Sequence, residues 1–172
     1  MVKLIIDFRK QGTISDLVPQ QKEYYESFLT TTYKDNVSAS EFLLIKHPRW
    51  SIIAGYYAMH DISKLFLAKK YNLRFSQPEV HGAVIQALRE LVKRKDILHL
   101  IEEADLEYME IISLHIALGQ GKDEREKTQY YTSETRKPEV EINKASYFLE
   151  KLVKPFLKLV ENLLNDSKGA AK

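Results

Sequence analysis

Residues 48 to 72 decide the fold that we predict for this chain. They contain the run Ile52-Ile-Ala-Gly-Tyr-Tyr-Ala-Met59, which is apolar on nearly every side of a helix. A helix of that kind is normally enclosed by other elements. Pro48 suits its first turn, because the N–H that proline lacks would be unpaired there in any case. The stretch therefore predicts the central helix of a bundle, from about Arg49 to Asn72.

Helical periodicity recurs on both sides of this segment. Apolar residues repeat at three- and four-residue steps within residues 24–44, 80–91 and 101–118. The clearest apolar stripe runs from Ala145 to Leu163, and Pro155 predicts a kink within it. Together these segments predict an all-α, up-and-down bundle of about five helices.

The two ends of the chain differ from the bundle. Residues 2 to 8 are rich in β-formers, which predicts an edge strand or an ordered arm within residues 1–14. The bundle then covers residues 15–165. Ser15 is the expected N-cap of its first helix, which is either long or broken near residues 35–38. Residues 166–172 are expected to form a flexible tail.

Composition excludes several classes of protein. The 172 residues fit one domain and include no cysteine, which excludes disulfides, thiolate nucleophiles and zinc–thiolate or iron–sulfur sites. The net charge of +2 is too small for a protein that is permanently coated by nucleic acid. No apolar run reaches the roughly 20 residues of a membrane helix, and the first residues do not resemble a signal peptide. We expect a soluble, cytoplasmic protein with no membrane partner.

The histidines lack the spacing of a metal site on bundle helices. No Glu-x-x-His or His-x-x-x-His pair occurs, and such pairs hold metals in helical proteins. The sequence also contains no P-loop, no Gly-x-Ser-x-Gly elbow and no Gly-x-Gly-x-x-Gly loop. We therefore expect neither a metal nor another cofactor.

His60 and Asp61 stand out because they lie inside the most apolar segment. A buried carboxylate is costly without a partner, so Asp61 either pairs with a neighbouring basic side chain or faces solvent. The functional alternative is that both residues line a ligand cleft between helices. His115, on the apolar stripe of a later helix, is most simply a hydrogen-bonded core histidine.

Basic residues are concentrated between Lys64 and Lys95, where eight of them accompany only Glu79 and Glu90. These cations end the second and third predicted helices, and cations at helix C-termini complement the macrodipole. In an up-and-down pair those two ends lie at opposite poles. We therefore expect that one protomer does not merge them into a single patch, whereas a dimer could place such an end beside an acidic segment.

The central helix also resembles a known family. The residues Gly55-Tyr-Tyr-Ala-Met-His-Asp-Ile-Ser-Lys-Leu-Phe-Leu67, followed by Tyr71-Asn-Leu73 and Val80-His81, resemble the HEPN (higher eukaryotes and prokaryotes nucleotide-binding) domain. Arg125 to Tyr131 and the helix after it resemble the Arg-x-x-Ala-x-Tyr junction and the closing helix of that family. The resemblance covers roughly residues 15–165.

The resemblance implies one of two kinds of activity. Many HEPN proteins are metal-independent endoribonucleases that use Arg-x(4–6)-His at a dimer interface, and others bind nucleotides, RNA or a minimal nucleotidyltransferase without cutting. At Arg125 the expected histidine is replaced by Tyr130, Tyr131 and Thr132. Arg94 and His99 fit the nuclease spacing, as do Arg74 and His81, but roughly 0.6 such matches are expected by chance, so two are weak evidence.

We therefore expect a HEPN-like module without nuclease activity, in a toxin–antitoxin or defence system. It would act as a homodimer or with a nucleotidyltransferase partner and engage a nucleotide or RNA through Arg125, Tyr130 and Tyr131, a phosphate-pairing fork with stacking rings. The alternative is an endoribonuclease in which His99 acts as general acid or base and Arg94 stabilises the phosphorane charge. A helical assembly protein without a ligand is the second alternative.

Overall fold

The computed structural model describes residues 3–119 and 137–169. It is an all-helical bundle with a small two-stranded sheet, as the sequence predicts. The elements are α1 (Ile5–Lys10), β1 (Ile14–Asp16), α2 (Pro19–Leu43), α3 (Pro48–Tyr71), β2 (Leu73–Phe75), α4 (Val80–Ala87), α5 (Lys95–Gly119), α7 (Pro138–Tyr147) and α8 (Lys154–Gly169). Two π-helical turns, η1 (Leu88–Val92) and η2 (Phe148–Val153), continue α4 and join α7 to α8.

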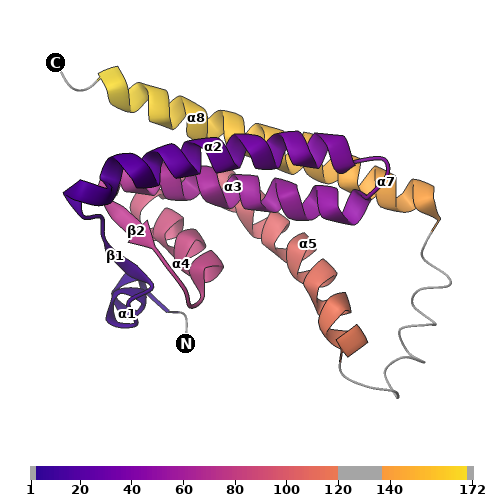
Figure 1. Ribbon diagram of the computed structural model, residues 1–172, viewed down its shortest axis with the longest axis horizontal. Coiled ribbons are helices and arrows are strands. Elements are labelled where there is room, and N and C mark those ends of the chain that lie inside the picture. The colour runs from indigo at the N-terminus through magenta and orange to yellow at the C-terminus, as the bar shows by residue number, and fades with distance from the viewer. Residues whose placement is uncertain (1–2, 120–136, 170–172) are drawn as a thin grey trace.

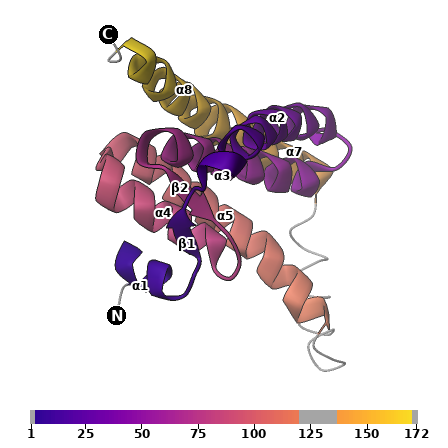
Figure 2. The ribbon, with the colours of Figure 1, turned by 60° about the vertical axis from the view of Figure 1, so that its left-hand side comes forward.

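The long helices form a layer with α3 at its centre. In Figure 1, α2, α3 and the continuous α7–η2–α8 segment run along the long axis of the molecule, while α5 leaves the layer at an angle. Figure 2 shows the same arrangement, with α1, α4 and the two strands gathered at one end. α3 packs against α2, α4, α5, α7, α8 and β2, which explains why its sequence is apolar on nearly every side.

Small side chains let α2, α3 and η2 approach closely. Ser40 Oγ donates to the Ser51 carbonyl oxygen at 2.8 Å, and Ser51 Oγ donates to the Ser40 carbonyl oxygen at 2.7 Å. A Cβ at Gly55 would lie only 2.9 Å from Val153 Cγ2. A Cβ at this crossing, one residue before Tyr56, would therefore force a neighbouring side chain to shift.

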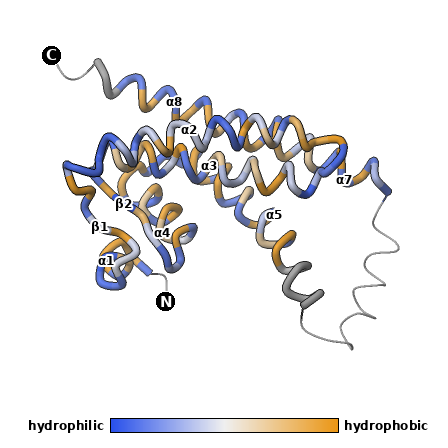
Figure 3. Tube along the Cα trace, viewed as in Figure 1, coloured by the Kyte–Doolittle hydropathy of each residue, from blue (hydrophilic) through white to orange (hydrophobic). Residues whose placement is uncertain are grey.

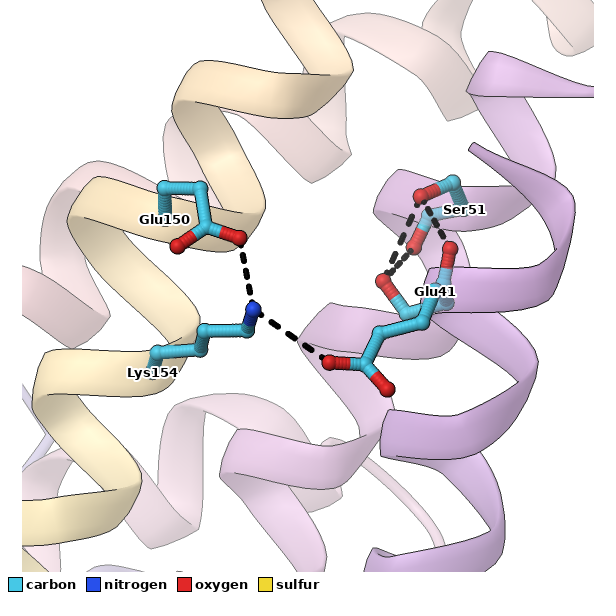
Figure 4. Close-up of polar contacts among 5 residues, drawn as sticks. Glu41, Ser51, Glu150 and Lys154 are labelled. Carbon is cyan, nitrogen blue, oxygen red and sulfur yellow. Dashed lines mark hydrogen bonds and ion pairs between the residues drawn. The ribbon is translucent and has the colours of Figure 1, made fainter. Parts of the chain in front are cut away.

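Nearby, an ion-pair group bridges the surface of α2, η2 and α8. Lys154 Nζ lies 2.6 Å from Glu150 Oε1 and 3.3 Å from Glu41 Oε1. Figure 4 shows Lys154 between these two carboxylates, with Ser51 on the helix behind Glu41. All three charged side chains are about half exposed, so the group contributes little to stability.

The N-terminal strand is present, but later in the chain than residues 2 to 8. Helix α1 begins within that segment, at Ile5, and the strand is β1, whose Ile14 and Asp16 pair with Phe75 and Leu73 of antiparallel β2. Ser15 lies in β1, so it does not cap the first helix, which begins at Pro19 after Val18. Helix α2 is long and unbroken through residues 35–38.

The last helix changes its winding before Pro155. The wider π turn η2 ends at Val153, two residues before that proline, and a π turn relieves the contact between a proline ring and the preceding turn. Helix α8 continues to Gly169, past residue 166 where the tail is expected to begin. In Figure 3, hydrophilic and hydrophobic residues alternate along α8, as they do in an amphipathic helix. Within the described ranges, no helix combines the length and apolarity that crossing a membrane requires.

Candidate functional site

Four polar or ionisable side chains meet where α3, α4 and α5 pack together. Tyr56 and His60 lie one turn apart on α3, which places them on the same face of that helix. His81 is in the first turn of α4, and Asp105 is near the middle of α5. We call these four residues the histidine cluster. The phenol of Tyr108 covers it, with its ring stacked on that of Tyr56 at a centroid distance of 4.0 Å.

A directed chain of hydrogen bonds runs through the cluster. The Tyr56 hydroxyl donates to Asp105 Oδ1. The oxygen of that hydroxyl is then left to accept a hydrogen bond, and His81 Nδ1 lies 3.1 Å from it. His81 therefore carries its proton on Nδ1, and its Nε2 holds the lone pair. Asp105 thus fixes the tautomer of His81 through Tyr56.

His60 takes no part in this chain of hydrogen bonds. It is 1% exposed, and neither of its ring nitrogens has a hydrogen-bond partner among the described residues. Its ring lies 4.5 Å from that of His81, with 27° between the two planes. Buried polar groups are nearly always paired, so an imidazole with two free nitrogens requires an explanation.

Burial sets the protonation states in the cluster. It lowers the pKa of His60 well below its usual value, and the neighbouring His81 and Lys64 lower it further. Burial also lowers the pKa of His81, although Asp105 raises it in part. The pKa of the Tyr56 phenol is raised by burial and by its hydrogen bond to Asp105. At neutral pH both imidazoles are therefore neutral and the phenol is protonated.

Asp61 follows His60 in sequence but has other partners. Its Oδ1 lies 2.6 Å from Lys64 Nζ, and its Oδ2 accepts a hydrogen bond of 3.1 Å from Asn36 Nδ2. The carboxylate is therefore paired with a neighbouring lysine, which is one of the two structural arrangements expected from the sequence. Of the two residues expected to line a ligand cleft, the histidine cluster includes only His60.

The structure does not assemble Arg94 and His99 into a catalytic pair. The Arg94 guanidinium donates to both carboxylate oxygens of Asp96, from Nε at 2.9 Å and from Nη2. The side chain of His99 is 77% exposed and its Nε2 lies 3.5 Å from Glu103 Oε2. No hydrogen bond or ion pair joins Arg94 to His99 in the part of the chain that the structure describes. In the other formal match, Arg74 donates to Gln21 while His81 belongs to the histidine cluster.

A surface pocket of about 360 Å³ lies at the other end of α3. It brings together the end of α3, the end of η1 and the last turns of α8. Its lining consists of apolar or aromatic side chains, two cations and one carboxylate: Phe66, Lys70, Tyr71, Val92, Arg94, Leu163 and Asp166. We call it the Lys70–Arg94 pocket.

The expected separation of the two basic helix ends is not observed, because residues from both ends line this pocket. His81, at the start of α4, contacts Tyr56 of α3, whereas Tyr71, at the end of α3, donates to the carbonyl oxygen of Leu91 in η1 at 3.1 Å. The segment α4–η1 therefore runs parallel to the second half of α3. The prediction of opposite poles is wrong, because the short strand β2 carries the chain back before α4 begins.

The remaining expected site residues lie beyond what the structure shows. Arg125, Tyr130 and Tyr131 fall outside the described residues, and so does the side chain of His115. No protein-family model, curated protein or solved structure matches this chain.

From the sequence, His60 is a candidate ligand-lining residue. Tyr56 and His81 stand out only within the HEPN resemblance and the Arg74–His81 spacing, and Asp105 has no signal of its own. His81 and Asp105 are distant from His60 in sequence and lie on other helices, so spacing within one helix does not connect them to it. One signal was available: His60 interrupts the most apolar segment of the chain, and such a residue needs polar partners from other helices.

Proposed function

We propose that this chain is a HEPN-like module that binds a nucleotide or the phosphate groups of RNA and does not cut RNA. The observation that carries the proposal is the convergence of Lys70 and Arg94 on one pocket with an aromatic and apolar lining. Its volume lies at the lower end of the range for small-ligand sites. Both cations are exposed and therefore accessible to an anion.

The chemistry of the pocket suits a ligand with a charged and a flat part. Lys70 offers an ammonium group to a phosphate, and Arg94 offers a second cation once it exchanges Asp96 for the ligand. Phe66 and Tyr71 provide aromatic surface for a base. The carboxylate of Asp166 repels phosphate but can accept hydrogen bonds from ribose hydroxyls or from the amino group of a base.

Further cations beside the pocket favour a polyanion. Lys93 and Lys95 flank Arg94 in the chain, both are exposed, and neither forms an ion pair with another described residue. By contrast, Lys69 lies 4.0 Å from Glu26, and Arg89 pairs with Glu102. Lys93 and Lys95 are therefore free to add phosphate contacts next to Arg94 in the chain.

The geometry gives less support to the nuclease alternative. A general base must reach the hydroxyl that it deprotonates. The cation that stabilises the developing charge must lie near the same phosphate. His99 does not line the pocket that contains Arg94, and its imidazole lies beside Glu103. The rest of the proposal, a cytoplasmic homodimer or a complex with a minimal nucleotidyltransferase, depends on the HEPN resemblance alone.

Binding and cleavage assays on the same protein test the proposal. Labelled ribonucleotides and mixed RNA are titrated into the wild type, Lys70→Glu and Lys151→Glu. Lys151 is an exposed lysine of η2, twelve residues before Leu163 and thus about 18 Å away along a helix. We expect Lys70→Glu to weaken binding about tenfold or more, the effect of losing one good phosphate contact, and Lys151→Glu to bind like the wild type.

Each alternative gives a different result. RNA cleavage in EDTA that His99→Ala abolishes would establish the endoribonuclease instead. Absence of binding at high protein concentration, or equal weakening by both lysine variants, would refute the pocket as the binding site. Size-exclusion chromatography with light scattering on the same samples tests the homodimer.

A further inference from the structure

The three strongest metal-ligating groups of the histidine cluster lie close enough to share one ion. One nitrogen from His60, one nitrogen from His81 and one carboxylate oxygen of Asp105 all lie within 4.8 Å of one another. The three residues come from α3, α4 and α5, so the site lies at the junction of three helices rather than along one. His60 is buried, and His81 and Asp105 are intermediate.

The orphaned nitrogens of His60 indicate that a partner belongs here. Leaving a buried polar group without a hydrogen bond is costly, and His60 has two such atoms in the most enclosed helix of the chain. A metal ion would satisfy one nitrogen directly. Neutral imidazole is the form that binds metals, and burial holds both histidines in that form, since it lowers the pKa of each.

The second sphere of the cluster already matches that of a metal site. A histidine ligand typically donates its other N–H to a hydrogen-bond acceptor that fixes its tautomer, most often a carboxylate, a backbone carbonyl or water. His81 Nδ1 has such an acceptor in the Tyr56 hydroxyl, which in turn donates to Asp105. The Nε2 lone pair of His81 is therefore free to bind an ion.

We propose that His60, His81 and Asp105 bind one divalent transition-metal ion of the Zn²⁺ or Co²⁺ class. Two imidazole nitrogens and one carboxylate oxygen suit these ions better than Mg²⁺ or Ca²⁺, which prefer oxygen ligands. Tetrahedral coordination with bonds of about 2.0–2.1 Å separates ligand atoms by about 3.3 Å. Ligand atoms that lie within 4.8 Å of one another would therefore close by no more than about 1.5 Å. A solvent molecule completes the fourth position.

Charges around the site oppose the ion only weakly. Lys64 is the nearby cation that lowers the pKa of both histidines, but its ammonium group is paired with Asp61 at 2.6 Å. Asp105 contributes one negative charge directly. Binding would join α3, α4 and α5 and so stabilise the junction of the helices.

Titration of the EDTA-treated, buffer-exchanged full chain with Co²⁺ tests the proposal, because tetrahedral Co²⁺ absorbs in the visible range. We expect one equivalent to bind, Zn²⁺ to displace it, and the melting temperature to rise with either ion. His60→Gln and Asp105→Asn should each weaken binding at least tenfold. Asp105→Asn keeps an oxygen that accepts from Tyr56, so it tests the ligand charge separately from the fold.

Two surface histidines serve as controls. His47→Gln and His99→Gln should bind like the wild type, although His99 with Glu103 is the arrangement that would bind a metal weakly at the surface. Circular dichroism establishes that every variant is folded. The proposal is overturned if the wild type gives no visible band, if His60→Gln and Asp105→Asn both bind normally, or if the band is lost in His99→Gln.

Discussion

Gly55→Ala tests the packing that fixes the position of Tyr56 and His60. The new Cβ would lie 2.9 Å from Val153 Cγ2, 3.2 Å from Ser40 Oγ and 3.3 Å from Phe148 Cε1. Carbon atoms prefer about 3.5–4.0 Å, so the Val153 contact is too short by roughly 0.6–1.1 Å. Overpacking of this kind costs about 1–3 kcal/mol. Replacing a mid-helix glycine by alanine raises the free energy of unfolding by about 0.8–1.0 kcal/mol. The net result is a decrease in the free energy of unfolding of about 1 kcal/mol.

Gly82→Ala is the matched control, because it makes the same substitution in α4 without a short contact. The nearest atom to a Cβ at Gly82 is Phe8 Cζ at 3.9 Å. This variant should therefore gain about 0.5–1 kcal/mol from helix propensity. The two substitutions are expected to change the free energy of unfolding in opposite directions, as measured by urea denaturation followed by far-UV circular dichroism.

A double-mutant cycle with Val153→Ala assigns the effect to a particular pair of atoms. Val153→Ala alone should cost about 2 kcal/mol, since it removes two buried methyl groups. It also removes Cγ2, so in this background Gly55→Ala should become neutral or stabilising. The expected coupling is about 1–2 kcal/mol. If the two changes are additive, or if Gly55→Ala stabilises the protein as Gly82→Ala does, the close crossing of α3 and η2 is refuted.

Two further predictions concern the histidine cluster. Tyr56→Phe leaves Asp105 Oδ1 and His81 Nδ1 without their shared partner, so urea denaturation should show a loss of about 1–3 kcal/mol; an unchanged midpoint would contradict the hydrogen-bond chain. In EDTA, stability should fall as the pH drops below about 6.5, because burial lowers the pKa of folded His60 and the unfolded chain then binds the additional proton. Between about pH 7 and about pH 5 this linkage amounts to at most about 2 kcal/mol for His60, and His60→Gln should flatten the profile where His99→Gln does not.

The sequence was most informative where burial alone decides the structure. The apolar run around Gly55 predicted the enclosed helix, and α3 begins at Pro48 and ends at Tyr71, one residue from each expected limit. The change of winding before Pro155 also follows from local chemistry. The N-terminal segment was harder to predict, because residues 5–10 form a short helix and the strand lies at residues 14–16. Short β-rich segments take their structure from tertiary partners, here β2.

The features that join distant parts of the chain, namely the histidine cluster and the Lys70–Arg94 pocket, depend on one connection that composition does not reveal. Asn72 ends α3 in the left-handed conformation, with φ of 56°, and β2 then carries the chain back along α3. As a result α4 begins beside His60 and η1 ends beside Lys70. An up-and-down arrangement of these two helices would place the C-terminal ends of α3 and of α4–η1 at opposite poles of the bundle. Both the histidine cluster and the convergence of Lys70 with Arg94 follow from this single reversal.

The same reversal makes the two proposed sites neighbours on shared elements, yet leaves them energetically separable. His60 and Lys70 are ten residues apart on α3, which corresponds to about 15 Å along the helix. Sites more than about 7–10 Å apart without common partners usually respond independently to substitution. His60→Gln should therefore lower Co²⁺ affinity without changing nucleotide affinity, and Lys70→Glu should do the reverse. If either substitution weakens both Co²⁺ binding and nucleotide binding, the two sites do not respond independently. They are then coupled through α3 and the α4–η1 segment.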